Sequence, residues 1–258
     1  DRWFDQGDNP WHQLGGLAWY AFWIVTVSGV YLYAVYDTSV HGSWSSVNGL
    51  RAGHWGLGGL MRGLHRYGSD AFVVFMVAHL LKEASAGRFR GFRWFSWVTG
   101  VPLLWLGYAS AIGGFWLVWD DLAQFSVIAT VEWLDVLPVF GDPLARNFLV
   151  PASVDDRFFS LLMFLHIGIP LLLLAAMWLH LQRVPHARTL PGRRLALGTL
   201  GTLSALAVLL PVRIGPPADL AVVPGALPLD WMLLWPHALH HATTAEFLWI
   251  LAGGSTLL

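Results

Sequence analysis

The chain has 258 residues, of which 56% are hydrophobic and 12% are charged, whereas an average soluble domain carries about 25% charged residues. This composition is typical of a membrane protein, and a formal net charge of −1 gives no reason to expect a nucleic-acid partner. Because the chain has no cysteine, it can form no disulfide, no cysteine-ligated iron–sulfur cluster and no thioether-attached haem.

Apolar segments close to the roughly 20 residues that a helix needs to cross a bilayer follow one another along the chain. We expect such spans at 14–36, 66–83, 96–119, 158–182 and 194–212, and a sixth from about residue 231 onward. The second is the least hydrophobic, because Arg62, Arg66 and Asp70 lie at its start. The first residue is not Met and the last residues lie inside an apolar run, so we expect the sequence to be trimmed at both ends.

Charged loops orient these spans. Lysine and arginine gather after the second and fourth spans, whereas the segment between the third and fourth spans is mostly acidic. The positive-inside rule places the two basic loops in the cytoplasm and the acidic segment outside. We therefore expect a multi-pass protein of a bacterial inner membrane. A Pro-rich connector, "RIGPPADLAVVPGALPLD", joins the first five spans to the last.

The second and fourth spans carry the same histidine spacing. His65 and His79 are 14 residues apart, and so are His166 and His180. Fourteen residues make about four turns, so each pair shares one helix face and its members lie about 21 Å apart along the axis. Since one span intervenes, the two helices run in the same direction, which places His65 level with His166 and His79 level with His180.

Buried imidazoles at this spacing favour haem ligation. A histidine in hydrocarbon is costly unless it finds a partner, and iron suits imidazole nitrogen. Two axial histidines leave no open position on the iron, so such a haem moves electrons and does not bind oxygen. The pattern predicts two haems, one near each membrane surface. The alternative, core histidines hydrogen-bonded to Ser, Thr or backbone, explains the two equal spacings less well.

Glycines repeat this period on the first and third spans. Gly15 and Gly29 are 14 residues apart, as are Gly100 and Gly114. A porphyrin edge fits between helices where the backbone approaches closely, which glycine permits. Because the chain has 27 glycines, chance spacings are common, and only the match to the histidine period gives this pattern weight.

The stretches "RGLHRYGSDAFVVFMVAHLLK", "GVPLLWLGYASAIGGFWLVW" and "HIGIPLLLLAAMWLH" resemble the cytochrome b subunit of bc-type quinol-oxidising complexes and its photosynthetic relatives. The resemblance implies an all-α membrane protein, with a dihaem four-helix transmembrane bundle over 1–190. One or two further transmembrane helices over 191–258 would resemble a truncated start of the family's C-terminal region. It implies two non-covalent b-type haems, an outer one on His65 and His166 and an inner one on His79 and His180.

The resemblance also assigns the neighbours of the haems. The four glycines above correspond to the family's haem-contact glycines. Arg62 corresponds to an arginine near an outer-haem propionate, and Lys82 falls where a cation neutralises an inner-haem propionate. Pro170 corresponds to a proline four residues after the ligand.

Two stretches depart from the family. Where it has Leu-Pro-Trp-Gly beside the outer quinol site, this chain has Val118 for the proline and Asp120 for the glycine. Its Pro-Glu-Trp-Tyr motif is at best Leu229–Met232, in which Asp230 replaces the glutamate that takes a quinol proton. A carboxylate near a quinol hydroxyl is a plausible base, and an interfacial aspartate beside an aromatic anchor is the alternative.

Other polar residues remain open between two interpretations. Asp120 and Asp121 are either solvated loop charges or face an extramembrane partner. Arg183 and His186 either bind a quinone carbonyl or belong to a basic loop. Three histidines share one helix face and either bind a metal ion or, as the favoured interpretation, lie at the membrane interface: His237, His240 and His241.

The preferred hypothesis is transmembrane electron transfer through two bis-histidine b haems, between a quinone/quinol pool and a redox partner in a multi-subunit respiratory complex. Its partners would be iron–sulfur, cytochrome c or periplasmic oxidoreductase subunits, and a homodimer is left open. One alternative is a membrane anchor that passes electrons from an extracytoplasmic oxidoreductase to quinone, with no outer quinol site. Another, from a different class, is a haem-free ion or proton transporter that uses the histidines as a relay.

Overall fold

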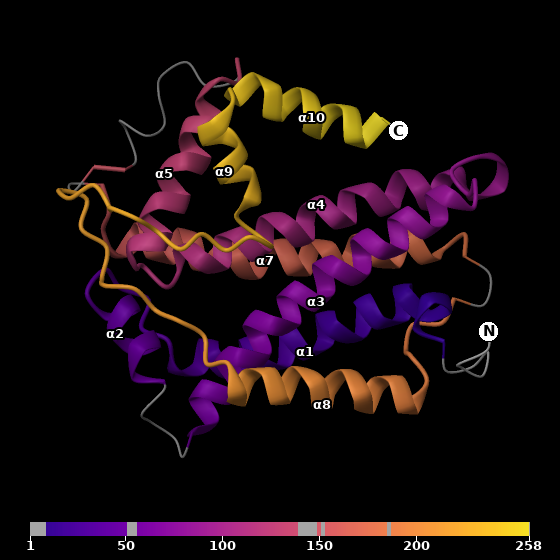
Figure 1. The fold of residues 1–258 in the computed structure, drawn as a ribbon, viewed down its shortest axis with the longest axis horizontal. Coiled ribbons are helices and arrows are strands. Elements are labelled where there is room, and N and C mark those ends of the chain that lie inside the picture. Colours follow the sequence, from indigo (N-terminus) through magenta and orange to yellow (C-terminus); the bar gives the residue numbers. More distant parts are fainter. Residues whose placement is uncertain (1–8, 51–55, 139–148, 151–152, 185–186, 258) are drawn as a thin grey trace. The chain divides into compact units, whose positions relative to one another are not determined.

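The computed structural model describes residues 9–50, 56–138, 149–150, 153–184 and 187–257. These residues form helices and, apart from one isolated bridge between Asp120 and Pro217, no extended pairing. The first five predicted spans are each present as one helix: α1 (Leu14–Val35), α3 (Leu57–Ser85), α4 (Trp94–Trp116), α7 (Asp156–Leu181) and α8 (Arg193–Leu209) (Figure 1). The all-α membrane fold is thereby confirmed.

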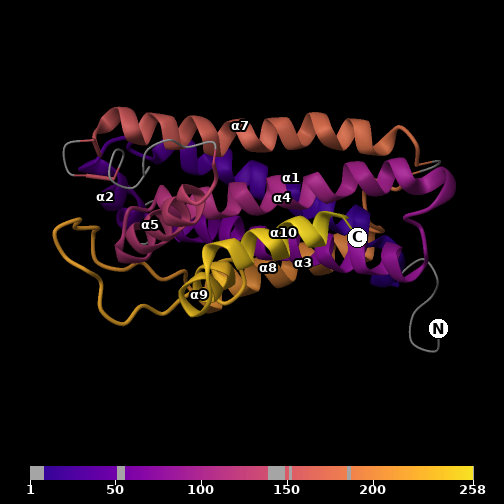
Figure 2. The same cartoon turned by 90° about the horizontal axis from the view of Figure 1, so that it is seen from above.

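Membrane-spanning character differs among these helices. Of the described helical stretches, three are both long and apolar enough to cross a bilayer: Pro10–Val35, Gly91–Trp116 and Asp156–Leu181. Helix α3 is longer, at 29 residues, but it carries charges in its first half. Two of these, Arg66 and Asp70, form an ion pair one turn apart, which lowers the cost of placing them in a helix that borders lipid. Helix α7 runs without a break through Pro170 (Figure 2).

The chain divides into two compact units. Unit 1 comprises Asp1–Val35, Gly49–Tyr108 and Ile169–Arg213, and unit 2 comprises Tyr36–Asn48, Ala109–Gly168 and Ile214–Leu258. Helices α4 and α7 therefore contribute one part to each unit. The domain boundary predicted near residue 190 falls within unit 1, between α7 and α8, and stays a prediction.

Unit 1 is a bundle in which α1 and α8 pack against α3. The α3–α8 contact is close: a Cβ added to Gly63 would lie 2.5 Å from the Cβ of Ala207. The hydroxyl of Tyr67 donates a hydrogen bond to the carbonyl of Leu210 at the end of α8. Small residues at such a crossing let two apolar helices approach and gain dispersion contact without a hydrophobic driving force from water. Helix α8 lies alongside this bundle in Figure 1.

Unit 2 holds short helices that the sequence did not predict. Helix α5 (Asp121–Asp135) lies in the segment that we expected to be an acidic loop, and α2 (Gly42–Gly49) precedes α3. A buried aromatic cluster anchors this unit, with the ring of Trp119 edge-on to that of Phe159 at 5.2 Å. Trp119 has a φ of 52°, a left-handed conformation uncommon for a bulky residue, which this packing stabilises.

The predicted sixth span is wrong as a single helix. The described residues from Trp235 onward form α9 (Trp235–Ala242) and α10 (Ala245–Leu257), which meet at a bend visible in Figures 1 and 2. Thr243 leaves helical geometry, and the hydroxyl of Thr244 accepts a hydrogen bond from the backbone N–H of Phe247. A threonine in that role is an N-cap, so the two threonines end one helix and begin another.

Candidate functional site

The proposed inner histidine pair lines a cavity of unit 1. His79 on α3 and His180 on α7 both contribute to a cavity of about 420 Å³. Apolar side chains such as Phe72 and Met177 line part of it, and charged side chains line another part. A volume of this order matches the pockets that hold small ligands and cofactors.

Each of these imidazoles lies against a glycine of the predicted set. A Cβ added to Gly15 would lie 3.4 Å from Cε1 of His79, and one added to Gly100 would lie 3.1 Å from Cε1 of His180. We expected the glycines to make room for a porphyrin edge. In the structure the space beside each glycine is taken by the imidazole itself, so glycine sets how deeply the ligand can sit between helices.

The two remaining histidines repeat this arrangement, each within its own unit. In unit 1, a Cβ on Gly29 would lie 2.9 Å from Cε1 of His65. In unit 2, a Cβ on Gly114 would lie 3.1 Å from Cε1 of His166. That His65 and His166 face one another stays a prediction.

Hydrogen bonds at Nδ1 orient three of the four rings. His65 Nδ1 lies 3.0 Å from the carbonyl oxygen of Val25, and His166 Nδ1 lies 3.0 Å from that of Ser110. His180 Nδ1 lies 3.1 Å from the hydroxyl of Thr99, which itself donates to the carbonyl of Phe95. An acceptor at Nδ1 selects the tautomer whose lone pair is on Nε2, and Nε2 would then be the metal ligand.

The residues present therefore fit an iron porphyrin held by two imidazoles. Both imidazoles line one cavity of about 420 Å³, a Cβ at Gly100 would press on His180, and the contact of His180 Nδ1 with Thr99 prepares its Nε2 for ligation. Among the described residues, His79 Nδ1 is buried and makes no hydrogen bond, which leaves this ring oriented by other means.

The two cations assigned to haem propionates are both engaged. Arg62 donates to the carbonyls of Val212 and Arg213, just beyond the end of α8, at 3.2 and 2.9 Å. Lys82 lines the cavity of His79 and His180, with its Nζ 3.7 Å from a carboxylate oxygen of Glu83. Lys82 thus shares a cavity with the two histidines, and the propionate role of both cations stays a prediction.

Asp120 is a structural residue and fits neither interpretation offered from the sequence. It is buried, and its Oδ1 accepts a hydrogen bond from the N–H of Ala123 as the N-cap of α5. Its Oδ2 accepts another from Gly215 in the Pro-rich connector. The side-chain amide of Gln124 holds the same connector through the backbone of Asp219 and Val222. Asp120 thus ties the connector to the start of α5.

Asp230 caps the turn before α9. Its Oδ1 accepts hydrogen bonds from the N–H groups of Met232 and Leu233, at 3.0 and 2.7 Å. This is a local role for the carboxylate, and its action as a quinol proton acceptor stays a prediction.

The histidines of α9 do not gather with other ligands. Among the described residues, no group of three or more His, Cys, Asp or Glu side chains is placed to hold a metal ion. His237 is buried in unit 2, where its Nε2 lies 2.8 Å from the hydroxyl of Thr130. Of the two residues considered for a quinone carbonyl, Arg183 lines the cavity and His186 lies outside the described residues.

Glu83 is a site residue that the sequence analysis missed. Its carboxylate lines the cavity and lies 4.0 Å from Nδ1 of His79. The available signal was its position four residues after a proposed ligand on the same helix, because residues i and i+4 are neighbours on a helix surface.

Two comparisons with known proteins concern the family and the fold of the chain. The family model described as cytochrome b/b6/petB matches residues 6–187. A solved structure titled "Hyperthermophilic respiratory Complex III" is similar with a TM-score of 0.77 and 19% sequence identity, over 98% of this chain and 74% of that one. At that identity the likeness supports the fold alone. Because the family model covers more than half of the chain, this integral membrane protein belongs to the cytochrome b family.

Proposed function

We propose that this protein carries electrons across a membrane through two b-type haems, between a quinone pool and other redox subunits of a respiratory complex. Its family makes it a protein of membrane electron transfer in a quinone-linked complex. The number of haems, their ligands and the bacterial inner membrane as location belong to the proposal. So do the partners, which would be iron–sulfur, cytochrome c or periplasmic oxidoreductase subunits.

The observation that carries the proposal is the cavity of unit 1, with His79 and His180 on its lining and a glycine behind each ring. A bis-imidazole haem supplies one-electron transfer at its iron. The chain's own residues supply the rest. The glycines let the imidazoles sit deep between helices, Thr99 sets the tautomer of His180, and apolar side chains keep water from the metal.

The outer pair is proposed by the same reasoning. His65 and His166 each rest on a glycine and each have Nδ1 at 3.0 Å from a backbone carbonyl, as ring-orienting contacts to a metal ligand require. Two haems about 21 Å apart along the helices would provide a path between the two membrane faces.

The experiment is a reduced-minus-oxidised visible spectrum with haem quantification on the purified protein. We expect b-type bands and two haems per chain, and His180→Leu should lose one of them. His41→Leu is the matched control, because His41 is exposed and outside the cavity. A purified wild-type protein without b-type bands would reject the proposal and favour the transporter alternative.

A second candidate is quinone turnover at the inner face alone, with an extracytoplasmic oxidoreductase feeding the outer haem. The observation that favours it concerns Asp120, which replaces the glycine of the family's motif beside the outer quinol site. Its carboxylate instead caps α5 and binds the connector. Under this function, inhibitors of the outer quinol site should leave quinone-dependent turnover unchanged. Inhibition by such compounds would reject the second candidate and leave the first intact.

A further inference from the structure

One of the four proposed ligands is oriented differently from the rest. His65, His166 and His180 have Nδ1 at 3.0–3.1 Å from a backbone carbonyl or a hydroxyl. His79 Nδ1 makes no hydrogen bond to a described residue, and the carboxylate of Glu83 lies 4.0 Å away. The ring of His79 therefore faces a charged group through Nδ1, the nitrogen opposite the atom that would bind the metal.

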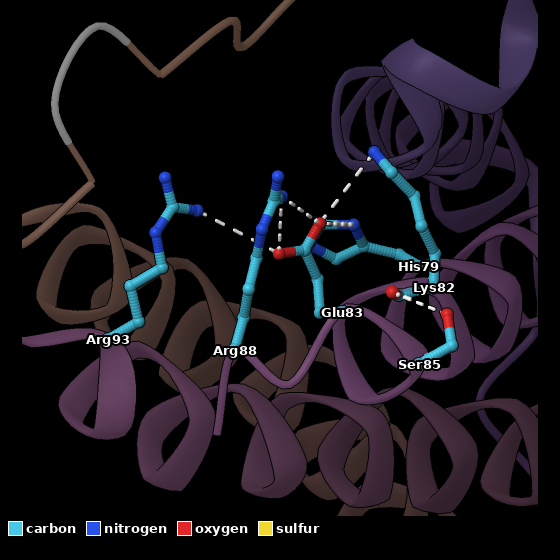
Figure 3. Close-up of polar contacts among 6 residues, drawn as sticks. All are labelled: His79, Lys82, Glu83, Ser85, Arg88 and Arg93. Carbon is cyan, nitrogen blue, oxygen red and sulfur yellow. Dashed lines mark hydrogen bonds and ion pairs between the residues drawn. The ribbon is translucent and has the colours of Figure 1, made fainter. Parts of the chain in front are cut away.

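Basic side chains hold the Glu83 carboxylate in this position. Nη1 of Arg88 donates to Oε1 and Oε2 at 3.1 and 2.9 Å, and Nη1 of Arg93 lies 3.8 Å from Oε2. Lys82 approaches Oε1 at 3.7 Å. Figure 3 shows the carboxylate between Arg88 and the imidazole of His79, with Arg93 beyond Arg88 and Lys82 on the other side. The side chain of Glu83 is 18% exposed, so water screens this cluster only in part.

The backbone explains why Arg88 reaches Glu83. Helix α3 ends at Ser85, and Gly87 then adopts a φ of 67°. The N–H of Gly87 donates to the carbonyl of Ala84, and the N–H of Arg88 donates to the carbonyl of Glu83. This pair of bonds with a left-handed glycine is a Schellman motif, which folds the chain back over the last turn of its helix. Both the backbone and the side chain of Arg88 therefore bind Glu83.

We propose that Glu83 is a positioning residue for His79, which orients the ring through Nδ1–H and lowers the reduction potential of the haem that His79 would hold. The inference rests on the proposed function. At 4.0 Å the two groups are beyond direct hydrogen-bond distance, and a small rotation of the imidazole would complete the link. A carboxylate behind a metal-bound imidazole raises its basicity and so favours the more highly charged ferric iron.

The basic residues act in the opposite direction. Lys82, Arg88 and Arg93 add positive charge near the same haem and favour the ferrous state, while they hold the carboxylate in place. Removing Glu83 therefore leaves three cations without their counter-charge, and the potential should rise. Removing Arg88 takes away one cation and frees the carboxylate, so the potential should fall.

The test is a spectroscopic redox titration of the purified protein and its variants. In Glu83→Gln we expect one of the two midpoint potentials to rise by about 59 mV, a tenfold shift of a one-electron equilibrium. In Arg88→Gln the same potential should fall, and Glu83→Asp should lie between wild type and Glu83→Gln. Glu246→Gln is the control, since Glu246 is exposed and in unit 2.

Two results overturn the inference. One is a Glu83→Gln protein that keeps both haems and both potentials. The other is a shift in the same direction for Glu83→Gln and Arg88→Gln, as a merely structural ion pair would give. If Glu83→Gln fails to retain haem, the potentials of Arg88→Gln become the test. A lowered potential in Arg88→Gln supports the inference, and unchanged potentials overturn it.

The haem concerned is identified by a double variant. His180→Leu should remove the inner haem, and adding Glu83→Gln should leave the remaining potential unchanged. Absence of haem from the wild-type protein would be a failure of the proposed function, which this titration separates from a failure of the role of Glu83.

Discussion

Adding one methyl group behind the histidines should have effects that follow the distances in the structure. A Cβ on Gly29 would lie 2.9 Å from Cε1 of His65, whereas a Cβ on Gly15 would lie 3.4 Å from Cε1 of His79. Carbon atoms in contact prefer about 3.5–4.0 Å. Alanine at Gly29 therefore requires a shift of about half an ångström, and alanine at Gly15 requires almost none.

The expected free energies follow from two opposing effects. Replacing glycine by alanine within a helix stabilises it by about 1 kcal/mol. Overpacking a close contact costs about 1–3 kcal/mol, and the ring of His65 cannot retreat easily, because its Nδ1 is held at 3.0 Å by the carbonyl of Val25. We expect Gly29→Ala to destabilise the protein by up to about 2 kcal/mol, and Gly15→Ala to be neutral or stabilising by up to about 1 kcal/mol.

Haem retention and thermal unfolding in detergent measure both effects. Gly29→Ala should bind one haem more weakly and unfold at a lower temperature than wild type, and Gly15→Ala should do neither. Equal behaviour of the two variants would show that the imidazoles do not rest on these glycines as the structure has them.

Three further predictions concern packing and charge elsewhere. Asp120→Ala should lower the free energy of unfolding by about 1–3 kcal/mol, because α5 loses its N-cap and the N–H of Gly215 loses its acceptor. Asp120→Asn should retain most of the wild-type stability, and thermal unfolding measures both variants. Gly63→Leu should release α8 from α3, because even a Cβ there would lie 2.5 Å from Ala207, and faster proteolysis after α8 would report it. Burial lowers the pKa of His237 to about 4, so the unfolded chain takes up a proton below about pH 6.5 and the folded chain does not. Stability should fall by up to about 3 kcal/mol between pH 6.5 and 4, and His237→Gln should flatten that slope; an equal slope in both proteins would contradict the assignment.

Local signals in the sequence predicted the long helices well. Length and hydropathy located α1, α4, α7 and α8 within a few residues, because a helix satisfies its own backbone wherever lipid or apolar neighbours cover it. Helix α3 was predicted too short, from 66 to 83 instead of Leu57–Ser85. Charges at Arg66 and Asp70 lowered its hydropathy, whereas their ion pair keeps those residues helical.

The shorter helices were missed because their signals are cap residues. Asp120 begins α5 inside a segment that its charge made look like a loop, and Thr244 begins α10 inside an apolar run that looked like one span. A cap of this kind is one side chain, and hydropathy averaged over about 20 residues does not register it.

The sequence by itself identified the four candidate histidines and the four glycines, because each pair has a spacing of 14 residues. Two residues at that spacing lie on the same face of a helix. Only the tertiary structure decided which glycine lies behind which histidine, which atom contacts Nδ1 in three of the four rings, and that Glu83 lies beside Nδ1 of His79. Gly15 and His79 belong to different helices, and so do Gly100 and His180. Contact between such partners depends on how two helices are rotated and spaced, which side-chain packing determines and helical periodicity does not.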